Sequence, residues 1–149
     1  TLVPVGPGEI TSQAGWPSTT PRADLQRIVG NMKSAGIRVS LFVDPDEAPV
    51  AWAAEVGADR VELYTEPFAK AFARGEGAQS LAQYTRAAER AHQLGMGVNA
   101  GHDLDLENLA LFRTLPHLDE VSIGHALMSH ALFVGLRQSV TDYLAACSA

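Results

Sequence analysis

Residues 37–56 read IRVSLFVDPDEAPVAWAAEV, an apolar run followed by a helical pattern. Residues 37–43 are rich in β-branched and aromatic side chains, which is typical of a buried strand. Asp44 then predicts a helix N-cap, and the helix continues to a glycine stop at Gly57. A strand followed directly by a helix is the repeating unit of a parallel α/β fold.

The same alternation extends in both directions from this stretch. Strands are expected over residues 2–5, 37–43, 60–64, 97–99 and 120–123. Helices are expected over residues 21–36, 45–57, a short piece within 66–77, 78–94, 105–116, and 126–146 with a break at Gly135. Thr20 and Asp105 stand at the N-cap positions of the first and fifth of these helices.

Strands separated by helices, without an Asn-Gly or Asp-Gly hairpin turn, predict a parallel sheet. Such an α/β sheet belongs either to a small doubly wound fold or to a (β/α)8 TIM barrel, and the pattern alone does not choose between them. A closed barrel has about 250 residues. At about 30 residues a unit, the 149 residues supply about five of its eight β/α units.

Composition excludes several classes of function. Eleven Lys+Arg against seventeen Asp+Glu give a formal net charge of -6, with no basic cluster to bind nucleic acid or an anionic membrane surface. The single cysteine, Cys147, has no partner for a disulfide or a zinc site. No apolar run approaches the roughly 20 residues of a membrane span, and the first residues lack a secretion signal. A cytoplasmic protein without nucleic-acid or membrane partners is therefore expected.

Functional groups of parallel α/β folds gather at the carboxyl ends of the strands. After the fourth expected strand, His102 and Asp103 follow Gly101. An imidazole on a rigid turn suits general acid–base catalysis near neutral pH, although a lone histidine is more often structural. After the fifth strand, Gly124 and His125 open a helix, where backbone N–H groups either cradle a phosphate or form a plain turn.

Two further positions have both a functional and a structural interpretation. Residues 6–17 form a connection longer than is usual in βα units, either a mobile flap whose Thr11 or Ser12 reaches a ligand or a surface loop. Glu62 lies inside the apolar run 60–64, where a buried carboxylate needs a ligand site or an ion-pair partner. We favour the ligand site.

The remaining histidines do not have metal-ligand spacing. His125 and His130 are separated by about 140° around a helix, so they do not share a face. His92 and His117 are expected at solvent-facing helix and loop positions. Asp44 is assigned to its helix as a cap. No metal site is therefore predicted.

Five short motifs of this chain form a specific combination. They are Glu9-Ile10-Thr11-Ser12, Val39-Ser40-Leu41-Phe42-Val43-Asp44, Glu62-Leu63-Tyr64-Thr65, Val98-Asn99-Ala100-Gly101-His102 and Ile123-Gly124-His125-Ala126. In this order and spacing they resemble the pyridoxine 5'-phosphate synthase family. That family is a TIM barrel that assembles as an oligomer, commonly an octamer built from dimers. The resemblance implies that residues 1–149 are the C-terminal part of one barrel domain, from about the fourth strand onward.

The resemblance also implies a reaction. The family condenses 3-amino-2-oxopropyl phosphate with 1-deoxy-D-xylulose 5-phosphate and closes the pyridine ring of pyridoxine 5'-phosphate with loss of phosphate and water. It uses no metal and no redox cofactor. By motif, His102 resembles the general acid and Thr11 the flap residue on the deoxyxylulose phosphate. Gly124 with His125 resembles the cradle of the other substrate's phosphate.

Asp103 stands where the family has a glycine whose amide helps to hold the phosphate, and it retains a backbone N–H. We include Asp103 and Glu62 among the substrate-binding residues. The family's N-terminal strands and their catalytic residues have no counterpart in this sequence, so the chain alone is not expected to catalyse the full reaction. The alternative from another class is a non-catalytic phosphometabolite-binding or assembly module, a half barrel that dimerises to cover its sheet edges.

Overall fold

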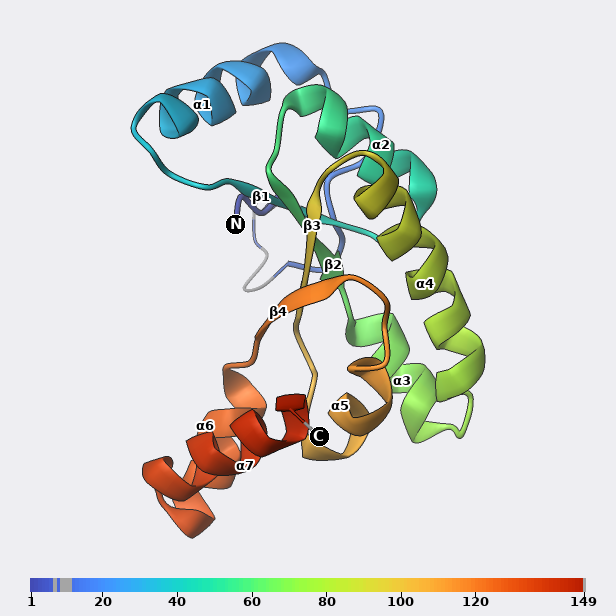
Figure 1. The fold of residues 1–149 in the computed structure, drawn as a ribbon, viewed down its shortest axis with the longest axis vertical. Coiled ribbons are helices and arrows are strands. Elements are labelled where there is room, and N and C mark those ends of the chain that lie inside the picture. The colour runs from blue at the N-terminus through green and yellow to red at the C-terminus, as the bar shows by residue number, and fades with distance from the viewer. Residues whose placement is uncertain (7, 9–11, 149) are drawn as a thin grey trace.

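A computed structural model describes residues 1–6, 8 and 12–148 of the chain. In these residues, a four-stranded parallel sheet has the strand order β1-β2-β3-β4, which is also the chain order (Figure 1). The strands are β1 (Ser40–Val43), β2 (Arg60–Tyr64), β3 (Gly97–Gly101) and β4 (Leu118–Ser122). The helices are α1 (Arg22–Ser34), α2 (Glu47–Val56), α3 (Glu66–Ala73), α4 (Gly77–Gln93), α5 (Leu106–Phe112), α6 (His125–Val134) and α7 (Leu136–Ser148). The alternation of strands and helices agrees with the predicted parallel α/β fold.

The expected first strand, residues 2–5, is wrong as a strand. Only Leu2 pairs with β1, in an isolated parallel bridge in which Leu2 N donates to Ser40 O at 2.8 Å and Phe42 N donates to Leu2 O at 3.0 Å. The next bond of a parallel ladder would run from the N–H of residue 4 to Phe42 O. Pro4 has no N–H, and Trp16 N donates to Phe42 O instead, at 2.8 Å.

Two of the three predicted helix caps are wrong. Asp46, and not Asp44, stands at the N-cap of α2, and its side chain makes no capping bond. The Asp44 carboxylate accepts the backbone N–H of Gly15 at 3.1 Å. A Cβ at Gly15 would lie 2.3 Å from Asp44 N, so this approach requires glycine.

At α1, Pro21 and not Thr20 occupies the N-cap position. The carbonyl of Thr20 accepts the indole N–H of Trp52 at 3.0 Å. The third predicted cap, Asp105 of α5, is confirmed. Its carboxylate accepts from the N–H of Asn108 while the Asn108 side chain accepts from the N–H of Asp105, which completes a capping box.

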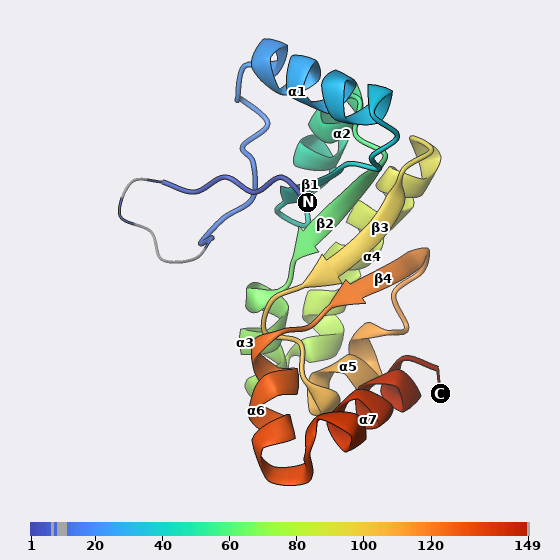
Figure 2. The ribbon, with the colours of Figure 1, turned by 90° about the vertical axis from the view of Figure 1, so that its left-hand side faces the viewer.

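The face of the sheet that meets the helices is apolar. Strand alternation points Leu41, Val43, Val61, Leu63, Val98 and Ala100 to this face, and all six are fully buried. Helices α2 and α4 contact this layer, and Figure 2 shows α4 behind the sheet. Beyond it, the rings of Phe68, Tyr84 and Phe112 pack edge to face with centroids 4.8 to 5.9 Å apart.

The opposite face of the sheet is polar. The register aligns Phe42, Glu62, Asn99 and Glu120 across the four strands, one layer above Arg60. Arg60 Nη1 donates to Asn99 Oδ1 at 2.8 Å and lies 3.3 Å from Asp119 Oδ2. The sheet therefore separates an apolar contact with the helices from a layer of charged and hydrogen-bonding groups.

The final helical segment breaks where predicted. Gly135 has φ 85° and divides residues 126–146 between α6 and α7. In the described part of the chain, no helix is both long enough and apolar enough to cross a membrane.

Replacing Phe68 by Ala is expected to destabilise the fold by about 3–5 kcal/mol, because the ring is fully buried among other rings and leaves a cavity. Urea unfolding followed by circular dichroism measures the change. Phe133→Ala removes the same ring from a position that is 89% exposed and is expected to change the free energy of unfolding of the monomer, measured at low protein concentration, by no more than about 0.5 kcal/mol. Equal losses in both variants would contradict the assignment of the core.

Candidate active site at the carboxyl ends of the strands

Strand pairing brings three loops together at one edge of the sheet. Gly101, the last residue of β3, pairs with Tyr64 of β2 on one side and with Ser122 of β4 on the other. His102 follows Gly101 directly, and Gly124 comes two residues after Ser122. The turn that carries His102 is therefore flanked by the end of β2 and by the start of α6.

The imidazole of His102 is half-buried between two aromatic rings. Its centroid lies 4.9 Å from that of Phe42 and 5.8 Å from that of Tyr64, which it meets edge to face at 86°. The backbone of His102 has φ 60° and that of Asp103 φ 51°, both in the left-handed region. The ring is therefore carried by a tight, strained turn at the carboxyl edge of the sheet.

Asp103 occupies a backbone conformation that favours glycine. Its φ of 51° lies in the left-handed region, and aspartate is one of the few residues other than glycine that tolerate it. The Asp103 side chain is exposed, and its carbonyl accepts the Asn108 side-chain amide at 2.9 Å.

Glu62 lies beneath this turn. It is 8% exposed, and its Oε2 accepts the hydroxyl of Thr1 at 2.5 Å. A Cβ at Gly101 would lie 2.9 Å from Glu62 Oε1, so the glycine lets the carboxylate approach the base of the His102 turn. Within the described residues Glu62 forms no ion pair, and its hydroxyl partner is Thr1.

Tyr64, Glu66 and Lys70 form a chain of polar contacts next to His102. The Tyr64 hydroxyl donates to Glu66 Oε2 at 2.7 Å, and Lys70 Nζ lies 2.7 Å from Glu66 Oε1. These two hydrogen bonds, with the charge of Lys70 and that of His102, lower the pKa of Glu66. Burial, reinforced by the neighbouring Glu66 carboxylate, raises the pKa of Tyr64. Glu66 therefore places a stable negative charge beside the His102 turn.

Gly124 and His125 lie on an exposed helix start. Gly124 is the N-cap residue of α6 and His125 its first residue. The first N–H groups of a helix lack intrahelical acceptors and can bind an anion. Thr11 lies outside the described residues, and Ser12, the other flap candidate, is buried.

The other histidines lie away from this edge. His92 and His117 are exposed, as predicted, and their rings stack at 3.8 Å near the amino ends of β3 and β4. His130 contacts Asp142 Oδ2 at 2.9 Å between α6 and α7. Among the described residues, no group of three or more histidine, cysteine or acidic side chains has the geometry of a metal site.

Sequence reasoning missed the contributions of Phe42, Tyr64 and Glu66. Tyr64 is two residues after Glu62 on one strand, so the alternation of side chains puts both on one face. That signal was available within the sequence. The ring contact of Phe42 with His102 and the position of Glu66 near His102 were not, because they depend on the pairing of strands that are far apart in the chain.

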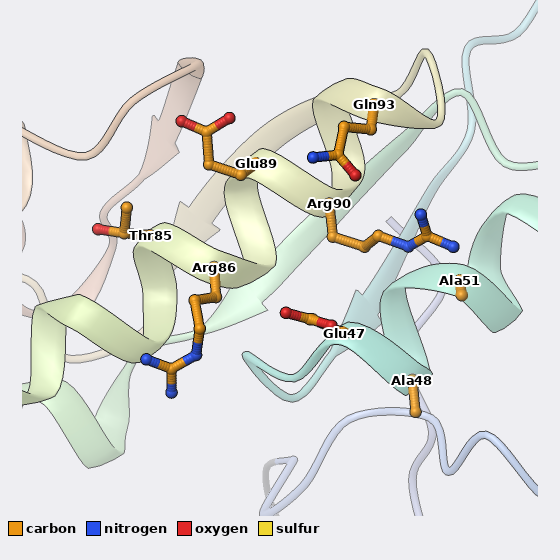
Figure 3. Close-up of a pocket in the computed structure, with 8 residues that line it drawn as sticks. All are labelled: Glu47, Ala48, Ala51, Thr85, Arg86, Glu89, Arg90 and Gln93. Atoms are coloured by element: carbon orange, nitrogen blue, oxygen red, sulfur yellow. The ribbon is translucent and has the colours of Figure 1, made fainter.

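A surface groove of about 500 Å³ lies between α2 and α4 (Figure 3). Arg86 and Arg90 line it together with Glu47 and Glu89, so its charges are balanced. Every lining residue belongs to one of the two helices. The groove is therefore separate from the strand ends, where the titratable cluster lies.

A half-buried imidazole and a buried carboxylate near the carboxyl edge of a parallel sheet give this α/β protein a candidate acid–base site. The model of the family described as pyridoxal phosphate biosynthesis protein PdxJ matches residues 1–149, and the chain belongs to this family. The resemblance of the five motifs is thereby confirmed.

Curated relatives agree with this assignment. A protein of Cytophaga hutchinsonii named pyridoxine 5'-phosphate synthase is 54% identical over 145 residues, which are 97% of this chain and 60% of that protein. Proteins of the same name from Christiangramia forsetii and Phocaeicola vulgatus are 48% and 50% identical, over 97% and 96% of this chain and 61% and 60% of their own lengths. The chain thus spans about three fifths of the length of these relatives.

Glu66→Gln is expected to make stability less dependent on acidic pH. The pKa of Glu66 is lowered from its ordinary value of 4.5, so its contribution is fully present above that value and is lost as the pH falls through the lower, folded-state pKa. Urea midpoints measured from about pH 5.5 to about pH 3 test this slope.

Lys70→Met removes the hydrogen bond that lowers the pKa of Glu66 most. This variant is therefore also expected to make the urea midpoint less dependent on pH at acidic pH. Parallel curves for the wild type and both variants would contradict the assigned role of the Glu66 contacts.

Proposed function

We propose that this chain is the part of a pyridoxine 5'-phosphate synthase that carries its proton donor and one phosphate site. The synthase condenses 3-amino-2-oxopropyl phosphate with 1-deoxy-D-xylulose 5-phosphate to give pyridoxine 5'-phosphate, phosphate and water. The observation that carries the proposal is the strained His102 turn, flanked by Glu62 and by the start of α6. Membership of the family and the printed name of the relatives support the same reaction.

His102 acts as the general acid in this proposal. Joining an amine to a ketone forms an imine with loss of water, and each later dehydration also expels a hydroxyl group. A leaving oxygen needs a proton, which an imidazolium on a rigid turn can supply near neutral pH. The half-buried ring between Phe42 and Tyr64 has a fixed orientation for this transfer. Glu62 serves as a buried carboxylate at the substrate.

The two phosphate groups need two anion sites. We assign one to the backbone at Gly124 and His125, where the first turn of α6 offers free N–H donors. The N–H of Asp103 lies on the neighbouring turn and contributes to substrate binding, with its carboxylate directed away from the phosphate. Thr11 remains the proposed flap contact for the deoxyxylulose phosphate. The proposed reaction involves no metal and no redox cofactor.

We assign the chain to about the last five β/α units of a (β/α)8 TIM barrel, as the C-terminal part of a single domain, with the first strand reduced to the Leu2 bridge to β1. Consecutive strand order supports a barrel over a doubly wound sheet, in which the order reverses at a switch point. The polar face of the sheet also fits a barrel interior, because an open parallel sheet would need apolar cover on both faces. A cytoplasmic setting stays a prediction from the sequence.

Self-association, as an octamer by family resemblance, is part of the proposal. The α6–α7 hairpin exposes large apolar side chains at its tip, with Leu132 85% and Phe133 89% accessible. Large exposed apolar side chains that lie together mark protein–protein interaction sites more often than single ones do.

The rival function is a non-catalytic phosphometabolite-binding or assembly half barrel. Supplying the part of the Cytophaga hutchinsonii relative that this chain does not cover separates the two. A synthase gains pyridoxine 5'-phosphate formation on mixing, whereas a binding module binds inorganic phosphate and gains no turnover.

His102→Ala is expected to lower turnover in this complemented enzyme by about 10²-fold, because the proton donor is removed. Isothermal titration with inorganic phosphate is expected to give nearly unchanged affinity, because the α6 amides are retained. Turnover equal to that of the wild type would remove His102 from the mechanism.

Phe133→Asp is expected to reduce self-association, because a charge replaces an apolar ring that is buried on contact. Analytical ultracentrifugation over a range of concentrations measures the oligomeric state. Gln79→Asp adds the same charge at an exposed position of α4 and should leave that state unchanged. Identical sedimentation of wild type and Phe133→Asp would exclude the hairpin tip from the interface.

A further inference from the structure

Thr65 stands at the N-cap of α3 and does not cap it. A threonine in this position ordinarily accepts a hydrogen bond from the N–H groups of its own helix. Here the side chain makes no such bond. Its Oγ1 donates instead to the carbonyl oxygen of His102, at 2.5 Å and 37 residues along the chain. Thr65 is fully buried, and the hydrogen bond to the half-buried His102 is partly buried.

The carbonyl that Thr65 binds belongs to a strained turn. His102 and Asp103 have φ values of 60° and 51°, two successive left-handed residues without a glycine. Such a pair persists only where surrounding contacts determine it. Side-chain donors hold both carbonyls, since Thr65 bonds that of His102 and Asn108 bonds that of Asp103 at 2.9 Å.

The end of β2 is itself anchored in the core. Tyr84 of α4 is fully buried, and its hydroxyl donates to the carbonyl of Tyr64 at 2.7 Å. Tyr64 in turn meets the His102 ring edge to face. A continuous set of contacts therefore runs from the buried helix layer through Tyr64 and Thr65 to the His102 backbone.

We propose that Thr65 is a positioning residue for His102: its hydroxyl holds the strained His102 carbonyl and so fixes where the imidazole projects toward the substrate. This role rests on the proposed function of His102 as proton donor. Thr65 does not touch the reacting atoms. Its loss affects the chemical step more than substrate binding, because Gly124, His125 and Thr11 hold the phosphate groups in the proposed function and only the Asp103 N–H lies on the turn that Thr65 positions.

Three variants test the proposal. Thr65→Val keeps the size of the side chain and removes the donor, whereas Thr65→Ser keeps the donor and removes a methyl group. Thr114→Val is the matched control, because the exposed Thr114 hydroxyl donates to the Leu111 carbonyl at 2.7 Å away from the strand ends.

In the enzyme complemented as above, Thr65→Val is expected to lower kcat about tenfold or more while KM changes less than about threefold. Thr65→Ser is expected to retain most of the activity, and Thr114→Val all of it. An unchanged kcat in Thr65→Val would overturn the proposal. A loss in Thr65→Ser as large as that in Thr65→Val would also overturn it, because packing of the methyl group would then be responsible.

A spectroscopic measurement on the 149-residue chain separates this proposal from the proposed function. Thr65→Val is expected to shift the NMR signals of the His102 ring and of the Asp103 amide, and Thr114→Val is not. Unshifted signals overturn the positioning role even if the enzyme is active. If the signals shift but the complemented wild type shows no turnover, the proposed synthase function is refuted. The hydrogen bond by which Thr65 positions His102 is then still supported. If Thr65→Val does not fold, Thr65→Ala compared with Thr65→Ser decides the same question.

Discussion

The pairing of Gly101 between Tyr64 and Ser122 is the constraint on which the candidate site depends. Parallel pairing ends three strands at one level, so residues that follow them in the chain meet at one edge. Because Gly101 has no side chain, the Glu62 carboxylate can lie against it. A shift of the register by one residue would move Glu62 and Tyr64 to the helix-facing side and dismantle the cluster.

The two faces of the sheet have different roles, since one packs against the helices and the other carries the polar groups of the candidate site. The face toward α2 and α4 carries fully buried aliphatic side chains and forms part of the hydrophobic core. The other face carries Arg60, Glu62 and Asn99, which are held by hydrogen bonds. Polar side chains on a buried strand are costly unless paired, so these hydrogen bonds offset the cost of placing polar groups on this face of the sheet.

Features governed by neighbouring residues could be predicted from the sequence. Gly57 ends α2 in the left-handed conformation, Gly135 divides the last helical segment, and Asp105 caps α5 with a residue three positions away. These helix ends depend on the conformational preferences and hydrogen bonds of residues close together in the chain, which can be predicted from the sequence. His102 and Gly124 are predicted as site residues because strand ends are the expected place for chemistry.

Features governed by distant partners could not be predicted in the same way. Asp44 fits a cap by local pattern, yet its carboxylate is bound by Gly15, 29 residues away. Thr65 occupies a capping position, and its hydroxyl is bound to His102 instead. Residues 2–5 do not form a strand because Pro4 has no N–H to donate to the carbonyl of Phe42. That carbonyl accepts the N–H of Trp16 instead. In each case a tertiary hydrogen bond replaces the local one.

The five histidines allow a direct test of where substrate binds. His102 and His125 lie at the carboxyl ends of the strands, and His92 and His117 stack near the amino ends. In the complemented protein, histidine-selective NMR during titration with 1-deoxy-D-xylulose 5-phosphate and with 3-amino-2-oxopropyl phosphate should shift the signals of His102 and His125 and leave those of His92 and His117 unchanged. Shifts confined to His92 and His117, or no shift at saturating substrate, would contradict an active site at the carboxyl edge of the sheet.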